Sequence, residues 1–146
     1  MKRTLGLTLL LFATLFSCMR QEKPLPAELS RAESVMWEHP DSALSILRSM
    51  PQSSLSSGKN YATWALLLAQ ARDKVYGKRL PDSLNIPFSD KLVQDAMDYF
   101  EKEGNLKRMA QTYYYKGQLL KDQKKITEAM PFFLKSKEMM TKLDEP

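Results

Sequence analysis

The sequence predicts an all-α domain built from about three antiparallel helix hairpins. Apolar residues recur at helical spacing in nearly every segment after residue 26, and no segment alternates apolar and polar residues as a half-buried strand would. The 146-residue chain contains only five glycines, and most breaks between the helical segments are short. Helices of this length joined by short connections are typical of an array of helical hairpins.

The first hairpin is expected between residues 27 and 50. An apolar stripe predicts a helix over residues 27–38, and His39-Pro40 ends it because the residue before a proline avoids the helical region. Asp41 is the predicted N-cap of a second helix, which Pro51 closes.

The second hairpin follows a polar loop. A longer helix is predicted over residues 60–77, and residues 78–89, with two prolines and several turn formers, should be irregular. Ser89 or Asp90 can cap the next helix, and Gly104-Asn105 supplies its end. Two more helices, over residues 106–122 and about 127–142, form the third hairpin.

The N-terminal segment predicts export. Lys2 and Arg3 precede an uncharged apolar run over residues 5–16, which is too short to span a bilayer, since a spanning helix needs about 20 residues. The run ends in Leu15-Phe16-Ser17-Cys18 and resembles the bacterial lipobox. This resemblance implies a lipoprotein signal peptide over residues 1–17, with Cys18 as the lipid-attachment site. The alternative is a lone cysteine without a modification.

Residues 18–26 are polar with two prolines and predict a lipidated tether ahead of a helical domain over residues 27–146. The chain is then held to the cell envelope by its acyl chains and faces the periplasm. Position 19 is not the aspartate associated with inner-membrane retention, and either membrane remains open.

Composition argues against nucleic acid as a partner. Removing residues 1–17 from the chain leaves 129 residues and lowers the formal charge from +5 to +3, because Lys2 and Arg3 leave without an acid. Acidic and basic residues are interspersed in the remainder, as on a solvated helical face.

The last hairpin resembles the tetratricopeptide repeat (TPR), best over residues 107–143. The pattern places an aromatic, a glycine and a large residue on one helix, then an alanine and a phenylalanine on the next: Tyr113, Gly117, Leu120, Ala129 and Phe133. The resemblance implies a right-handed α-solenoid. Gly117 and Ala129 should sit opposite each other where the helices cross, because small residues let two backbones approach.

Three residues depart from the repeat pattern. Lys116 replaces the usual leucine, Thr141 replaces the usual proline, and Pro131 falls early in the last helix, where it is tolerated only if its missing N–H belongs to the first turn. Earlier segments match less well, with Ala96 and Phe100 in the places of Ala129 and Phe133.

No residues are arranged for catalysis, and no cofactor or metal is expected. The chain has one histidine, and after the anchor no thiol, no glycine-rich phosphate loop and no carboxylate pair at metal spacing. His39 has no second histidine with which to share a metal, so we interpret it as structural.

Protein binding is the predicted function. In TPR arrays the first helix of each hairpin lines a concave groove, and the resemblance implies four partner-binding places: Gln111, Tyr114, Gln118 and Lys121. These side chains suit a protein or peptide partner. The alternative interpretation of Tyr114 is that the run of three tyrosines at 113–115 is only core and rim.

The sequence thus predicts a membrane-anchored scaffold for protein–protein interaction. The alternative is the sensory N-terminal region of a longer signalling protein. The last helix carries Phe132, Leu134, Met139 and Met140 without a capping helix behind it, which indicates a truncated product or a covered face, with self-association as one means of covering it.

Overall fold

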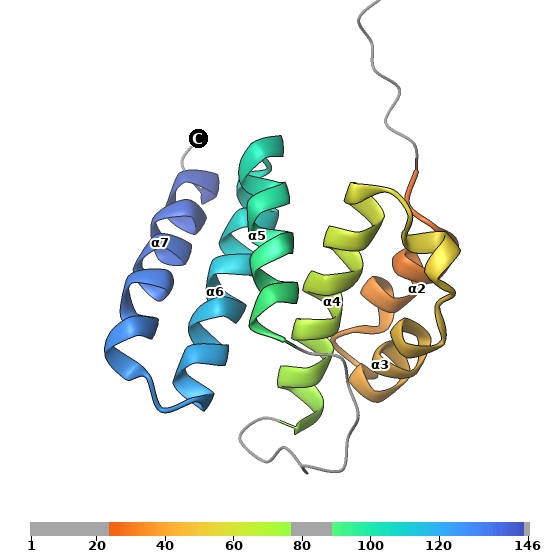
Figure 1. The fold of residues 1–146 in the computed structure, drawn as a ribbon, viewed down its shortest axis with the longest axis horizontal. Coiled ribbons are helices and arrows are strands. Elements are labelled where there is room, and N and C mark those ends of the chain that lie inside the picture. Colours follow the sequence, from red (N-terminus) through yellow and green to blue (C-terminus); the bar gives the residue numbers. More distant parts are fainter. Residues whose placement is uncertain (1–23, 77–88, 145–146) are drawn as a thin grey trace, which may run out of the picture.

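The computed structural model describes residues 24–76 and 89–144, which form six helices and no strand (Figure 1). These are α2 (Ala27–Val35), α3 (Pro40–Ser49), α4 (Gly58–Tyr76), α5 (Asp90–Glu103), α6 (Leu106–Asp122) and α7 (Ile126–Asp144), with a short 3₁₀ helix η2 (Gln52–Leu55). The helices pack in consecutive pairs, so the all-α prediction is confirmed. The predicted signal peptide, Cys18, most of the tether and nearly all of the predicted irregular segment lie outside the described residues.

Helix α4 lies at the centre of the arrangement. It packs against its pair partner α5 and against α2, α3 and α6, so the first helices of the three pairs contact one another in order (Figure 1). Residues 62–71 of α4 are all buried. A helix buried around its whole girth is expected where neighbours cover every side.

The structure corrects the boundary between α2 and α3. Helix α2 ends at Val35, earlier than predicted, and residues 36–38 form a turn in which the N–H of His39 donates to the carbonyl of Val35 at 2.8 Å. Helix α3 begins at Pro40 with His39 as its N-cap residue, so Asp41 is the second helical residue and not the cap. Proline suits the first position because its missing N–H would have no helical acceptor there.

Helix α5 is capped at its start by Ser89, one of the two predicted caps, and ends at the predicted Gly104. The side chain of Ser89 accepts a hydrogen bond from the N–H of Leu92 at 3.3 Å. Gly104 ends α5 with a φ of 75°, a left-handed conformation that glycine adopts without steric cost. Asn105 then caps α6 by accepting from the N–H of Arg108 at 3.1 Å. Two residues therefore end one helix and start the next.

One buried side-chain hydrogen bond joins α4 to the end of α3. The indole N–H of Trp64 donates to the carbonyl of Leu47 at 2.8 Å. That carbonyl lies in the last turn of α3, and the residue four positions later is Pro51, which has no N–H to donate. Trp64 thus supplies the donor that the chain itself lacks at this point.

The ring of Phe133 lies against the backbone of α6 at Gly117. A Cβ placed on Gly117 would be 2.7 Å from Cε1 of Phe133, and the three nearest atoms all belong to that ring. The structure thus packs Phe133, one of the residues of the predicted repeat pattern, directly against this glycine. Ala129, Tyr113 and Leu120 are all buried.

Two departures from the repeat pattern are accommodated in the pair α6–α7. Pro131 is the sixth residue of α7, beyond the first turn where we expected it to be tolerated, and the helix continues through it. The carbonyl of Thr127 loses its helical donor, but Thr127 is exposed, so water can replace that donor. Lys116 is buried, and its ammonium bonds to Oδ1 of Asp90 at 2.6 Å.

Helix α7 carries several exposed apolar side chains. They are Ile126, Met130, Leu134, Met140 and Leu143. Of the four residues that the sequence singled out on this helix, Leu134 and Met140 are exposed, and Phe132 and Met139 are half-buried. This is the surface for which the sequence predicts self-association.

Candidate functional site

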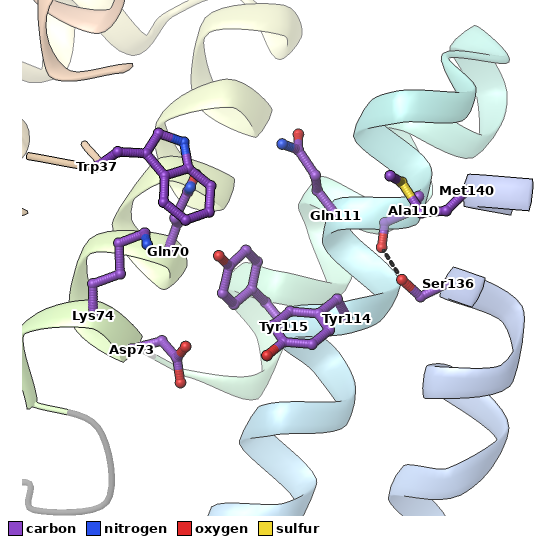
Figure 2. Close-up of a pocket in the computed structure, with 10 residues that line it drawn as sticks. All are labelled: Trp37, Gln70, Asp73, Lys74, Ala110, Gln111, Tyr114, Tyr115, Ser136 and Met140. Atoms are coloured by element: carbon purple, nitrogen blue, oxygen red, sulfur yellow. Dashed lines mark hydrogen bonds between the residues drawn. The ribbon is translucent and has the colours of Figure 1, made fainter. Parts of the chain in front are cut away.

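A pocket of about 360 Å³ lies between α4, α6 and α7, beside the turn that follows α2 (Figure 2). Residues from all four segments line it: Trp37, Gln70, Asp73, Lys74, Ala110, Gln111, Tyr114, Tyr115, Ser136 and Met140. The pocket therefore depends on the packing of the first helices of the second and third pairs against each other.

The predicted groove residues occupy one side of α6. Gln111 and Tyr114 line the pocket. Gln118 and Lys121 lie beyond it on the same helix, joined by a hydrogen bond of 2.6 Å from the Lys121 ammonium to Oε1 of Gln118. Nε2 of Gln118 donates to Oδ1 of Asp73 on α4 at 3.2 Å. The four residues thus form a continuous polar strip that starts in the pocket.

Tyrosine rings from α6 form one wall of the pocket. Figure 2 shows both rings projecting from α6 toward α4. Tyr114 is 41% exposed and Tyr115 is buried, with ring centroids 5.1 Å apart and planes at 85°. Tyr114 also packs against Phe133, at a centroid distance of 5.8 Å. Burial raises the pKa of both phenols, so they stay neutral at physiological pH and can donate hydrogen bonds.

Trp37 lies at the mouth of the pocket. It belongs to the turn after α2 and is 75% exposed, more than any other large apolar residue in the described part of the chain. The ammonium of Lys74 sits 3.4 Å from the centroid of its ring. A cation over the face of an indole is attracted by the ring quadrupole, so Lys74 holds this exposed ring beside the pocket.

Asp73 places a carboxylate in the pocket. Its hydrogen bond from Gln118 is to a neutral amide, and the nearby Arg72 pairs instead with Asp122, at 3.8 Å. Burial raises the pKa of the Asp73 carboxyl above its usual value, although the hydrogen bond from Gln118 opposes this change. The carboxylate of Asp73 is thus half-buried and forms no ion pair with the described residues, although Arg72 and Lys121 attract it at longer range.

Gln70 is the most deeply placed polar group of the pocket. Its residue is 5% exposed, and its side chain makes no hydrogen bond to any described residue. None of its nitrogen or oxygen atoms is sealed from solvent, because the pocket gives access to them. A primary amide offers two donors and an acceptor, so an unused hydrogen-bonding group faces the cavity.

Helix α7 closes the far side of the pocket. The hydroxyl of Ser136 donates to the carbonyl of Ala110 on α6 at 2.8 Å, and this bond is buried (Figure 2). Met140 lies one turn further along and adds a flexible apolar side chain. The position of α7, and with it this wall, is therefore fixed by a polar contact to α6.

The remaining predictions about chemistry concern His39, metals and the membrane. His39 lies exposed at the start of α3 and is not among the residues that line the pocket. Within residues 24–76 and 89–144, no three His, Cys, Asp or Glu side chains are grouped so that they could hold a metal ion. Over the same residues, no helix is both long and apolar enough to cross a bilayer.

Sequence reasoning missed the residues that α4 and the turn contribute. Trp37 was assigned to a helix that ends two residues earlier. Gln70 carried a usable signal, because it is a single amide within an otherwise apolar run over residues 65–71. No sequence signal marks Asp73 or Lys74 as a site residue, because nothing local specifies which turn of α4 faces α6.

Comparison of the chain with known protein families, with curated proteins and with solved structures found no match.

Proposed function

We propose that this chain is a binding protein whose pocket and polar strip on α6 hold an extended segment of a protein partner. The observation that carries the proposal is the convergence of amides, tyrosines and an exposed tryptophan on one pocket, including an amide with no partner of its own. Aromatic residues provide contact area at low entropic cost, and amides match the donors and acceptors of a peptide backbone.

The order of the helices is consistent with this role. The first helices of the pairs, α2, α4 and α6, contact one another in sequence, as a TPR-like solenoid requires. In such an array the groove-facing side chains come from these helices. The right-handed solenoid and the TPR relationship are therefore part of the proposal.

The envelope location is the second part of the proposal and rests on the sequence. Lipid on Cys18 would hold the helical domain at a membrane surface through a short tether, so the pocket would meet membrane-proximal partners. No catalytic step is included, because the pocket contains no nucleophile placed beside a base.

Site-specific photocrosslinking in cells tests the binding role. A benzophenone amino acid at Gln111, in the pocket, should form an adduct, whereas the same group at Lys102, an exposed residue of α5, should not. Adding Tyr114→Ala should abolish the adduct formed at position 111. Equal adducts at both positions, or an adduct that is indifferent to Tyr114→Ala, would contradict the proposal.

A further inference from the structure

Two polar side chains of the pocket, Asp73 and Gln70, offer acceptor oxygens to an entering group. Asp73 carries a half-buried negative charge, and among the described residues its hydrogen bond comes from the neutral amide of Gln118. Arg72 and Lys121 act on this charge only at longer range. Gln70, which is nine-tenths buried, makes no hydrogen bond to the described residues, so its carbonyl oxygen is free to accept one. A carboxylate and an amide oxygen are both acceptors suited to an N–H donor that carries positive charge.

The walls are also suited to a cation. Tyr114, Tyr115 and Trp37 all contribute rings to the same pocket, and the faces of aromatic rings attract positive charge. Trp37 already binds a cation within this chain, since Lys74 lies 3.4 Å from its ring centroid. The site thus combines a negative charge with rings that stabilise a positive one.

We propose that this pocket takes the cationic side chain of a lysine or arginine from the bound partner segment, with Asp73 and Gln70 accepting its hydrogen bonds. This inference rests on the proposed protein-binding function and specifies the chemistry of the partner. The tyrosines flank the stem and charged head of the entering side chain, and Gln111 is left for the partner's backbone.

The two other side-chain classes fit less well. An acidic side chain would be repelled by the carboxylate of Asp73, while the pocket's one basic residue, Lys74, is held over Trp37. An apolar side chain would remove water from Asp73 and Gln70 without replacing its hydrogen bonds, which is costly for a carboxylate.

Four blocked pentapeptides provide the test. Each has alanine at the four outer positions, and the central residue is lysine, arginine, glutamate or norleucine, the last being an uncharged analogue of lysine. The full chain, labelled with nitrogen-15, has two tryptophans, of which Trp37 borders the pocket and Trp64 is buried with its N–H bonded to Leu47. Titration should move the indole resonance of Trp37 and leave that of Trp64 in place.

Variants separate the roles of charge and fold. We expect Asp73→Asn to weaken binding of the lysine and arginine peptides about tenfold or more, since a charge-assisted bond becomes a neutral one. Asp95→Asn makes the same change in net charge on α5, outside the pocket, and should have no effect. Lys74→Met should strengthen binding about two- to fivefold by removing a like charge at the pocket mouth. An unchanged Trp64 resonance in each variant shows that the fold is intact.

Specific results overturn the inference. Norleucine binding as tightly as lysine, glutamate binding best, an unchanged affinity in Asp73→Asn, or weaker binding in Lys74→Met would each do so. The proposed function is tested apart from this: if the photocrosslink at position 111 still depends on Tyr114 but none of the basic peptides shifts Trp37, protein binding stands and the basic-side-chain pocket falls.

Discussion

Phe133 occupies the space that any side chain on Gly117 would need. A Cβ at position 117 would lie 2.7 Å from Cε1 of Phe133, a separation that real Cβ atoms essentially never show. The pair α6–α7 therefore packs as it does because position 117 has no side chain.

We expect Gly117→Ala to lower the free energy of unfolding by about 1–2 kcal/mol, as overpacked core positions do. At an open helical position the same change would be stabilising by about 0.5–1 kcal/mol, so the sign of the effect is diagnostic. Urea denaturation measures it. Combining Gly117→Ala with Phe133→Leu should remove most of the loss, and a stabilised Gly117→Ala would contradict the contact.

Trp64→Phe should cost about 1–3 kcal/mol, because it leaves the buried carbonyl of Leu47 without a donor. Trp37→Phe is the matched control: Trp37 is exposed, so its replacement should change stability by less than about 0.5 kcal/mol. Thermal and urea unfolding of the two variants should differ accordingly. Equal losses would mean that the hydrogen bond of Trp64 contributes little.

Stability should fall at alkaline pH because of Tyr113. Burial raises the pKa of Tyr113 to about 12, with a further contribution from its hydrogen bond to Glu101. The unfolded chain ionises this phenol near its ordinary pKa of 10, so the stabilisation is complete below pH 10 and is lost between pH 10 and 12. Tyr113→Phe should flatten the fall in urea midpoint across that interval. An identical slope would show that Tyr113 is not its source.

Asp73 should reduce stability at neutral pH, the reverse of an ion-paired carboxylate. Because its folded pKa is raised, principally by burial, its ionised form is less favourable in the fold, and stability decreases as pH rises above about 4. Asp73→Asn keeps an oxygen to accept from Gln118 and should slightly raise the urea midpoint at pH 7. A lower midpoint would indicate that the ionised carboxylate stabilises the fold.

Cys18→Ala should release the protein from the membrane fraction, because it removes the thiol that the predicted lipid modification requires. Fractionation of cells that produce either form, with detection of the helical domain, measures the change. Serine at position 18 serves as a control that keeps the size of the side chain but lacks the thiol, and it should behave as alanine does. Retention of both variants would contradict the anchor.

Sequence patterns predicted the helices well where end signals are local. Helix α6 runs over the predicted residues 106–122, Gly104 ends α5 as predicted, and Ser89 is one of the two caps that the sequence offered. Asn105 was expected only to help end α5 and also caps α6. Each of these signals acts through hydrogen bonds within a few residues. The end of α2 and the N-cap of α3 were wrong because proline at position 40 can begin a helix as readily as it ends the preceding one.

The candidate site was predictable only in part. Gln111 and Tyr114 follow from helical periodicity on α6 together with the repeat pattern. Asp73 and Gln70 reach the same pocket through the register of α4 against α6, which depends on packing between residues about 40 positions apart. Periodicity describes one helix at a time and carries no information about that register.

The burial of α4 on every side has a consequence for how the molecule unfolds. Loss of α2, α3 or α5 would expose a long apolar surface of α4, so helices α2–α5 should melt in one cooperative transition rather than pair by pair. The pair α6–α7 joins this block through α4, α5 and an ion pair of 2.8 Å between Arg108 of α6 and Glu33 of α2; as an outer pair of the described helices, its amides should exchange with deuterium sooner. Helix α6 forms one wall of the pocket. An occupant that contacts both α4 and α6 would therefore slow deuterium exchange in α6–α7 and stabilise the packing of this pair against the other described helices.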